Sequence, residues 1–184
     1  MIRKIINFQT SSSKSIQKSK TLLFDLKGVL LCKKIDEPSK ENSLLSVVNF
    51  TETIALLKTC KAAGHKLFVL SNLSIETYET IKQEPEIASL FSFFDDIIIS
   101  EMTPYEKPNP EIFTYFCEQY NIQPIDCIFI DDKQENLYGA QAAHINKTIL
   151  CSNFDIDHIK NELVKYGILQ HHEMIELNIP TGQA

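Results

Sequence analysis

The chain has 184 residues, of which 43% are hydrophobic and 23% charged, and its net charge is −6 at pH 7. These values are typical of a single globular domain with a proper core, long enough to be an enzyme. No apolar stretch reaches the length of a membrane span, because Asp95 and Asp96 interrupt the richest one, ASLFSFFDDIIIS. We therefore expect a soluble protein that does not contact a membrane.

The first 20 residues carry five basic residues and no acidic one. Without them the chain holds 13 basic and 24 acidic residues, a net charge of −11, so we expect that it repels nucleic acid. The segment is rich in Ser and Lys, as transit peptides are, but Arg3 is its only Arg and it has no long apolar core. We interpret residues 1–20 as a disordered basic tail of a cytoplasmic protein, with a targeting segment as the alternative.

The cysteines show neither a CxxC pair nor a zinc-like spacing to His. We therefore expect reduced, mostly buried thiols. They are Cys32, Cys60, Cys117, Cys127 and Cys151.

From residue 21, short apolar runs alternate with longer helical patterns. In chain order we predict a strand at 21–25, a helix at 49–64, a strand at 65–71, a helix at 75–83, a strand at 94–100, a helix at 108–121, a strand at 126–132, a helix at 134–144, a strand at 147–151 and a helix at 155–167. Residues 171–184 are interpreted as a tail. The alternation predicts an α/β, Rossmann-like three-layer sandwich, with a mainly parallel five-stranded sheet and helices on both faces.

Polar side chains follow three of the predicted strands, at the sheet edge where ligands bind in such folds. Asp25 follows the first strand, Ser71 and Asn72 the second, and Asp131 with Asp132 the fourth, while Lys107 lies in the loop after the third. The chain has no GxxxxGK loop, no GxGxxG motif and no internal repeat.

These residue types together predict a metal and phosphate site. Asp25, Asp131 and Asp132 would repel one another without a cation between them, and a cluster of oxygen ligands suits Mg²⁺ better than zinc. Ser71, where a strand leads into a helix, can hold phosphoryl oxygens together with backbone N–H groups, and Lys107 adds positive charge.

Four segments resemble the four motifs of the haloacid dehalogenase-like (HAD) hydrolase superfamily in order and spacing: FDLKGVL, LFVLSN, EKPNPEIF and IFIDDKQEN. The resemblance extends from residue 21 to about 165, and it is closest to the phosphatase branch with a paired Asp in the fourth motif. It implies that a Mg²⁺-dependent enzyme hydrolyses phosphate monoesters through an aspartyl-phosphate.

The resemblance also implies a role for each residue. Asp25 is the nucleophile and a metal ligand, Asp131 is a further ligand, and Asp132 is a ligand or lies just behind the ligands. Ser71, Asn72 and Lys107 hold the transferred group. Asn136, one helical turn after Asp132, steadies that loop.

Lys27 departs from the family pattern. Phosphatases of the superfamily normally have a second Asp there, a general acid worth about 10²–10⁴ in rate. The backbone carbonyl of this position usually ligates the metal, and Lys27 can still offer that carbonyl, so we keep Lys27 among the catalytic and metal-binding positions.

Three roles for the Lys27 side chain remain open. It could replace part of the metal's charge, lose its proton and act as acid or base, or turn to solvent and leave a slow phosphatase or an inactive fold. A dehalogenase is disfavoured because Arg3 is the only Arg of the chain. Lys33, Lys34 and Lys40 are better explained as a solvated basic segment than as a phosphonatase's Schiff-base lysine.

The spacing leaves no room for a full cap domain over the site. Only 46 positions separate Asp25 from Ser71, which leaves residues 31–49 for a minimal cap. An open site favours a bulky phosphorylated substrate or closure by another subunit of an oligomer.

Two hypotheses follow for the core domain at residues 21–170. The first is a phosphohydrolase, slow or atypical because of Lys27; the alternative is a catalytically lapsed module that binds a phospho-ligand or a protein partner. The histidines are expected to bind no metal: His65 is interpreted as a surface residue, His144 as a helix end where the family usually has Gly, and His171 and His172 as part of the tail.

Overall fold

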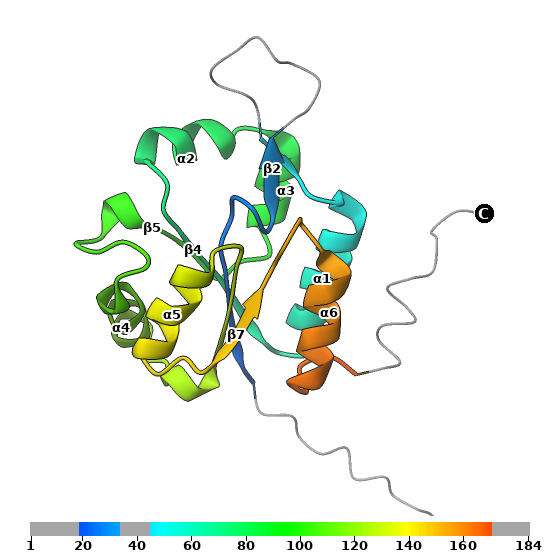
Figure 1. Cartoon of the computed structure of the whole chain (residues 1–184). Helices are drawn as coiled ribbons and strands as arrows, with labels where there is room; N and C mark the ends of the chain where they lie inside the picture. Colours follow the sequence, from blue (N-terminus) through cyan, green and yellow to red (C-terminus); the bar gives the residue numbers. More distant parts are fainter. Residues whose placement is uncertain (1–18, 34–44, 171–184) are drawn as a thin grey trace, which may run out of the picture.

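The computed structural model describes residues 19–33 and 45–170 (Figure 1). Most of the two predicted tails, residues 1–18 and 171–184, lies outside the described residues, as do Lys34 and Lys40. Lys20, the last residue of the predicted N-terminal tail, pairs its Nζ with Asp126 Oδ1 at 2.5 Å.

Five parallel strands form the central sheet in the order β5-β4-β1-β6-β7. Their bounds are β1 Thr21–Phe24, β4 Lys66–Ser71, β5 Asp96–Ile99, β6 Cys127–Asp131 and β7 Lys147–Leu150. The chain starts in the middle of the sheet and builds outward first to one side and then to the other. This order confirms the predicted Rossmann-like α/β fold.

Helices cover both faces of the sheet (Figure 1). The helices α4 Pro110–Gln119 and α5 Gln134–Ala142 lie on one face, and α1 Phe50–Ala62 with α6 Ile156–Lys165 on the other. Successive side chains of β1 alternate between the two cores: Leu22 and Phe24 pack with the α1 and α6 side, Leu23 with the α4 and α5 side. Because both faces are covered, the central strand is buried at every position, and three of its four residues are apolar.

Smaller elements stand at the carboxyl end of the sheet (Figure 1). The antiparallel pair β2 Leu31–Lys33 and β3 Leu45–Val47 falls within the segment predicted as a minimal cap, and its connection, residues 34–44, lies outside the described residues. The helices α2 Ile75–Ile81 and α3 Pro85–Phe91 follow β4, and α3 contacts β3. Two 3-10 turns complete the described chain, η1 Ser100–Met102 and η2 Pro124–Asp126.

The prediction for His65 is wrong. Its side chain is 2% exposed, and its Nδ1 accepts a hydrogen bond from the Lys20 backbone N–H at 3.1 Å. Its Nε2 lies 3.2 Å from the carbonyl oxygen of Ile168. His65 is buried because the chain enters β1 and leaves α6 on either side of it. His144 ends α5 with a φ of 66°, the left-handed conformation that favours Gly.

The five cysteines are free thiols, as expected, and four of them are buried. Across residues 19–33 and 45–170, no helix combines the length and the apolar character needed to span a membrane.

Candidate active site

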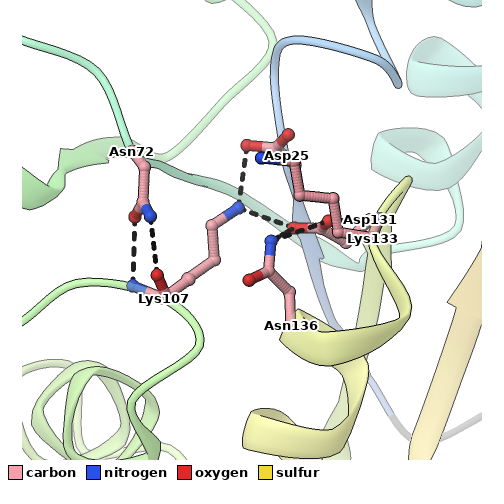
Figure 2. Close-up of polar contacts among 6 residues, drawn as sticks. All are labelled: Asp25, Asn72, Lys107, Asp131, Lys133 and Asn136. Atoms are coloured by element: carbon pink, nitrogen blue, oxygen red, sulfur yellow. Dashed lines mark hydrogen bonds and ion pairs between the residues drawn. The ribbon is translucent and has the colours of Figure 1, made fainter.

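Lys107 joins two carboxylates at the carboxyl end of the sheet (Figure 2). Its Nζ lies 2.8 Å from Asp25 Oδ1, just after β1, and 2.6 Å from Asp131 Oδ2, the last residue of β6. All three side chains are buried. The structure thus brings together three of the residues that the sequence placed at this edge, and one ammonium group partly neutralises two carboxylates.

Asp131 accepts three further hydrogen bonds from two groups. Asn136 Nδ2 donates to Oδ1 at 2.9 Å and to Oδ2 at 3.0 Å, and the Lys133 backbone N–H donates to Oδ1 at 2.9 Å. Both oxygens of Asp131 therefore have donors, and the start of α5 fixes the orientation of this carboxylate.

The backbone of Lys107 is held by Asn72. Asn72 Nδ2 donates to the Lys107 carbonyl at 2.7 Å, and the Lys107 N–H donates to Asn72 Oδ1 at 3.0 Å (Figure 2). The amide of Asn72 is thus engaged in positioning the lysine, a role more specific than the one expected from the sequence. The peptide bond that follows, Lys107–Pro108, is cis.

Gly139 of α5 also supports this loop, and the sequence reading missed it. A Cβ atom at Gly139 would collide with the carbonyl oxygen of Pro108. The helix can therefore approach the Lys107 loop only because this residue has no side chain. A glycine inside a helical pattern was the available signal.

Asp132 differs from Asp25 and Asp131 because one of its carboxylate oxygens has no hydrogen-bond partner among the described residues. Its Oδ1 is buried and accepts no hydrogen bond from any described residue. Its carboxylate packs against Gly28, whose φ is +94° and where a Cβ would collide with Asp132 Oδ2. Gly28 thus allows the turn after Asp25 to lie directly against Asp132.

The electrostatics of the cluster favour a bound cation. Burial raises the pKa of Asp25; Lys107 opposes this shift and Asp131 adds to it. Burial also raises the pKa of Asp132, and the charges of Asp131 and Asp25 raise it further. A positive ion among the three carboxylates would remove this unfavourable charge.

The donor set fits Mg²⁺. One oxygen from each of Asp25, Asp131 and Asp132 lies within 4.8 Å of the other two, and all are carboxylate oxygens. The buried Asp132 Oδ1 without a donor is the atom that a hard cation would satisfy.

Above the carboxylates lies a cleft of about 750 Å³ between the β2–β3 pair and α2. Its floor includes Asp25, Ser71 and Lys107, and Ser71 is 2% exposed at the end of β4. Its walls include Lys33 and Leu45 from the strand pair and Glu76, Thr77, Thr80 and Ile81 from α2.

Lys27 lines the same cleft and is exposed. Its ammonium group makes no hydrogen bond or ion pair with another side chain in the described part of the chain. The Lys27 side chain thus faces solvent at the mouth of the site.

Comparisons with known proteins agree with this geometry. A family model described as haloacid dehalogenase-like hydrolase matches residues 44–144, a range that includes Ser71, Lys107 and Asp131. A phosphoglycolate phosphatase of Psychrobacter arcticus is 29% identical over 93 residues, which are 49% of this chain and 38% of that protein. The human N-acylneuraminate-9-phosphatase is 28% identical over 127 residues, 68% of this chain and 50% of that protein. The chain spans about half or less of the length of these curated relatives.

Among solved structures, a HAD family enzyme from Bacteroides thetaiotaomicron in complex with magnesium and inorganic phosphate shares the fold. It is 19% identical with a TM-score of 0.58, and the match covers 72% of this chain and 94% of that one.

Proposed function

The chain belongs to the haloacid dehalogenase-like hydrolase family, and we propose that it hydrolyses phosphate monoesters through a covalent phosphate on Asp25. The observation that carries the proposal is the buried arrangement in which Lys107 bridges Asp25 and Asp131 beneath an open cleft. The named phosphatases among its relatives support the same reaction class.

In the proposed first step, a carboxylate oxygen of Asp25 forms a bond to phosphorus while the bond from phosphorus to the leaving oxygen breaks. Lys107 already lies 2.8 Å from Asp25 Oδ1, so its ammonium group can contact the phosphoryl oxygens as they approach. The buried Ser71 hydroxyl on the cleft floor is a second donor to that group. In the second step, water attacks phosphorus and Asp25 leaves as a carboxylate.

Mg²⁺ would be held by Asp25, Asp131 and Asp132, with the backbone carbonyl of Lys27 as a further ligand. It would supply positive charge against the phosphoryl oxygens when bound. The magnesium and phosphate bound by the Bacteroides relative support this choice of ion. Asn136 and the Lys133 N–H keep Asp131 in place for this role.

The proposed domain is one core over residues 21–170, with residues 31–49 as a minimal cap. Because the cleft is open, we propose that the substrate is bulky or that a second subunit covers the site.

An assay with p-nitrophenyl phosphate, with and without Mg²⁺, tests the proposal on wild type and Asp25→Asn. The expected result is slow turnover that needs both Mg²⁺ and Asp25, with a phosphorylated wild-type enzyme trapped by acid quench. Absence of any Asp25-dependent turnover or phosphoenzyme would support the alternative, a lapsed module that binds a phospho-ligand or a protein.

A further inference from the structure

Two lysine side chains lie at the mouth of the cleft, on the side from which the leaving group would depart. A nucleophile attacks phosphorus in line with the leaving group, so a substrate on Asp25 directs that group away from the floor and toward the mouth. Lys27 and Lys133 both line the cleft and are exposed. Figure 2 shows the Lys133 side chain extending from the start of α5 toward Asp25.

The ammonium groups of Lys27 and Lys133 are less compensated than that of Lys107, although the charge of Lys133 acts on Asp132 and opposes the rise in its pKa. Lys107, the third cleft lysine close to the carboxylates, forms ion pairs with Asp25 and Asp131, whereas Lys27 and Lys133 form no such ion pair with a described residue. Two positive charges without an ion pair in the described part of the chain therefore face the space that the leaving group occupies.

Among the described residues, the carboxyl groups that line the cleft lie on its floor or on its far wall. Of the carboxyl groups among the described lining residues, Asp25 and Asp132 belong to the floor. The others, Glu76 and Glu84, come from α2 and from the turn before α3, on the opposite wall from the strand pair. In the described part of the chain, the mouth beside Asp25 can thus stabilise a negative charge, and the carboxyl groups beside it are the proposed metal ligands Asp25 and Asp132.

We propose that the substrates are phosphoryl compounds whose leaving group is itself a stable anion, an acyl phosphate or a phosphoanhydride, and that Lys27 and Lys133 stabilise the departing anion. This inference rests on the proposed hydrolase function and specifies its substrate class. The lysines act as fixed positive charges and transfer no proton.

The first step then needs no acid. An Asp25 oxygen bonds to phosphorus, the bond from phosphorus to the leaving oxygen breaks, and its electron pair stays on that oxygen, which departs as a carboxylate or phosphate anion. In the second step water bonds to phosphorus, Asp25 regains its carboxylate electron pair, and both protons of the water remain on the inorganic phosphate. Atoms and charge balance in both steps.

The choice of substrate follows from the basicity of the leaving oxygen. A carboxylic acid has a pKa near 4, so its anion leaves unprotonated. An alkoxide is about as basic as hydroxide, far more basic than a carboxylate, and it needs a proton during bond cleavage. General acid help is worth about 10²–10⁴ in rate, which is the disadvantage expected here for alkyl esters.

The test measures kcat/KM with Mg²⁺ for acetyl phosphate, pyrophosphate, aryl phosphates of graded phenol pKa and ethyl phosphate. Wild type is compared with Lys27→Asp, which restores a carboxyl group, and with Lys27→Met and Lys133→Met, which remove one charge each. Lys66→Met is the control, since Lys66 is exposed at the other end of β4. Thermal unfolding verifies that each variant is folded.

From the least basic to the most basic leaving group of the series, kcat/KM should fall in both enzymes. The fall should be about 10²–10⁴-fold larger in wild type than in Lys27→Asp. Lys27→Met and Lys133→Met should each lower turnover of acetyl phosphate or pyrophosphate by about tenfold, and Lys66→Met should not. Preference for either compound over ethyl phosphate supports the inference, and the two arms separate acyl phosphates from phosphoanhydrides.

A wild-type rate that varies with the leaving group no more than that of Lys27→Asp would overturn the substrate class while leaving Asp25-dependent hydrolysis intact. Unchanged acetyl phosphate and pyrophosphate turnover in Lys27→Met and Lys133→Met would overturn the role of the two lysines. No Asp25-dependent turnover of any compound would instead overturn the proposed function itself, and the inference with it.

Discussion

Gly139 in α5 lies directly against the carbonyl oxygen of Pro108, the residue after Lys107. A Cβ at this position would also come within 3.3 Å of the Phe113 ring. The contact connects a helix on the sheet face to the loop that carries the central lysine of the site, and the geometry of that loop depends on it.

We predict that Gly139→Ala destabilises the protein and lowers activity. In a helix interior this change normally stabilises by about 1 kcal/mol. Here the new methyl group collides with backbone, so the sign should reverse and Lys107 should move away from Asp25. Urea unfolding and kcat measure both effects, with Tyr138→Ala, on an exposed residue of the same helix, as the control. Stabilisation by Gly139→Ala would show that the helix moves freely relative to the loop.

Lys107→Met should be severely destabilising without Mg²⁺. It leaves Asp25 and Asp131 buried without their shared counter-ion, a loss of about 3–5 kcal/mol in the free energy of unfolding. The double variant Lys107→Met with Asp131→Asn should recover part of that loss. Urea unfolding in EDTA gives these values.

Lys160→Met is the matched control for Lys107→Met. Lys160 is equally buried, but its partner Asp157 has a side chain 68% exposed and stays solvated when the lysine is lost. The expected cost is about 1 kcal/mol or less. Equal losses for both lysine variants would argue that packing, and not the buried carboxylates, makes Lys107 important.

Mg²⁺ should stabilise the wild type more than it stabilises Asp132→Asn. At a concentration 100 times its Kd, a ligand adds about 2.7 kcal/mol, a rise in Tm of roughly 5–10 °C for a chain of this size. Asp132→Asn should cost no stability in EDTA, because the pKa of Asp132 is raised by burial and by like charges. Differential scanning fluorimetry measures the Tm in EDTA and its rise with Mg²⁺, with Glu118→Gln as the control. An equal rise in Tm for wild type and Asp132→Asn would exclude Asp132 as a ligand.

The stability of the metal-free protein should fall with pH because of Asp25. Burial holds its pKa above the ordinary value of 3.8. As pH rises above that value, the unfolded chain loses the Asp25 proton before the folded chain does, so the free energy of unfolding decreases until pH passes the raised pKa. The advantage of Asp25→Asn over wild type should therefore grow with pH and then level off, as measured by urea unfolding in EDTA. A difference that is constant with pH would contradict the raised pKa.

The strands and helices of the core could be predicted because their patterns are long and bounded. Buried parallel strands are continuous apolar runs, and residues such as Pro110 and Gly64 mark where a helix begins or ends. The convergence of Asp25, Lys107 and Asp131 followed from one rule, that the carboxyl ends of parallel strands share an edge.

The rest depended on contacts between distant parts of the chain. The strands of the β2–β3 pair are three residues each, too short to show a period. The predicted elements include no helix between residues 83 and 94, where Pro85 begins α3. The approach of Gly139 to Pro108 and the missing donor at Asp132 Oδ1 arise only when separate elements pack together. A glycine inside a helical pattern indicates a close contact without naming its partner, and local pattern carries no information about the missing donor.

The contacts of His65 also join distant parts of the chain, and the local sequence did not indicate them. His65 precedes β4, where an exposed ring was expected, yet both of its nitrogens lie against backbone groups of Lys20 and Ile168. Since Nδ1 accepts from an N–H, Nε2 carries the proton and donates to the carbonyl. The ring thus links the start of β1 to the chain that follows α6.

His65→Ala should lower the free energy of unfolding by about 2–4 kcal/mol, because it leaves two buried backbone groups without partners and opens a cavity. His65→Gln, which keeps an acceptor and a donor, should recover part of the loss. His158→Ala, at an exposed position of α6, is the control and should change stability by less than about 0.5 kcal/mol. Because His65 lies at the opposite end of β4 from Ser71, kcat of the folded fraction should stay unchanged. A lowered kcat at full folding would mean that the two ends of the sheet are coupled.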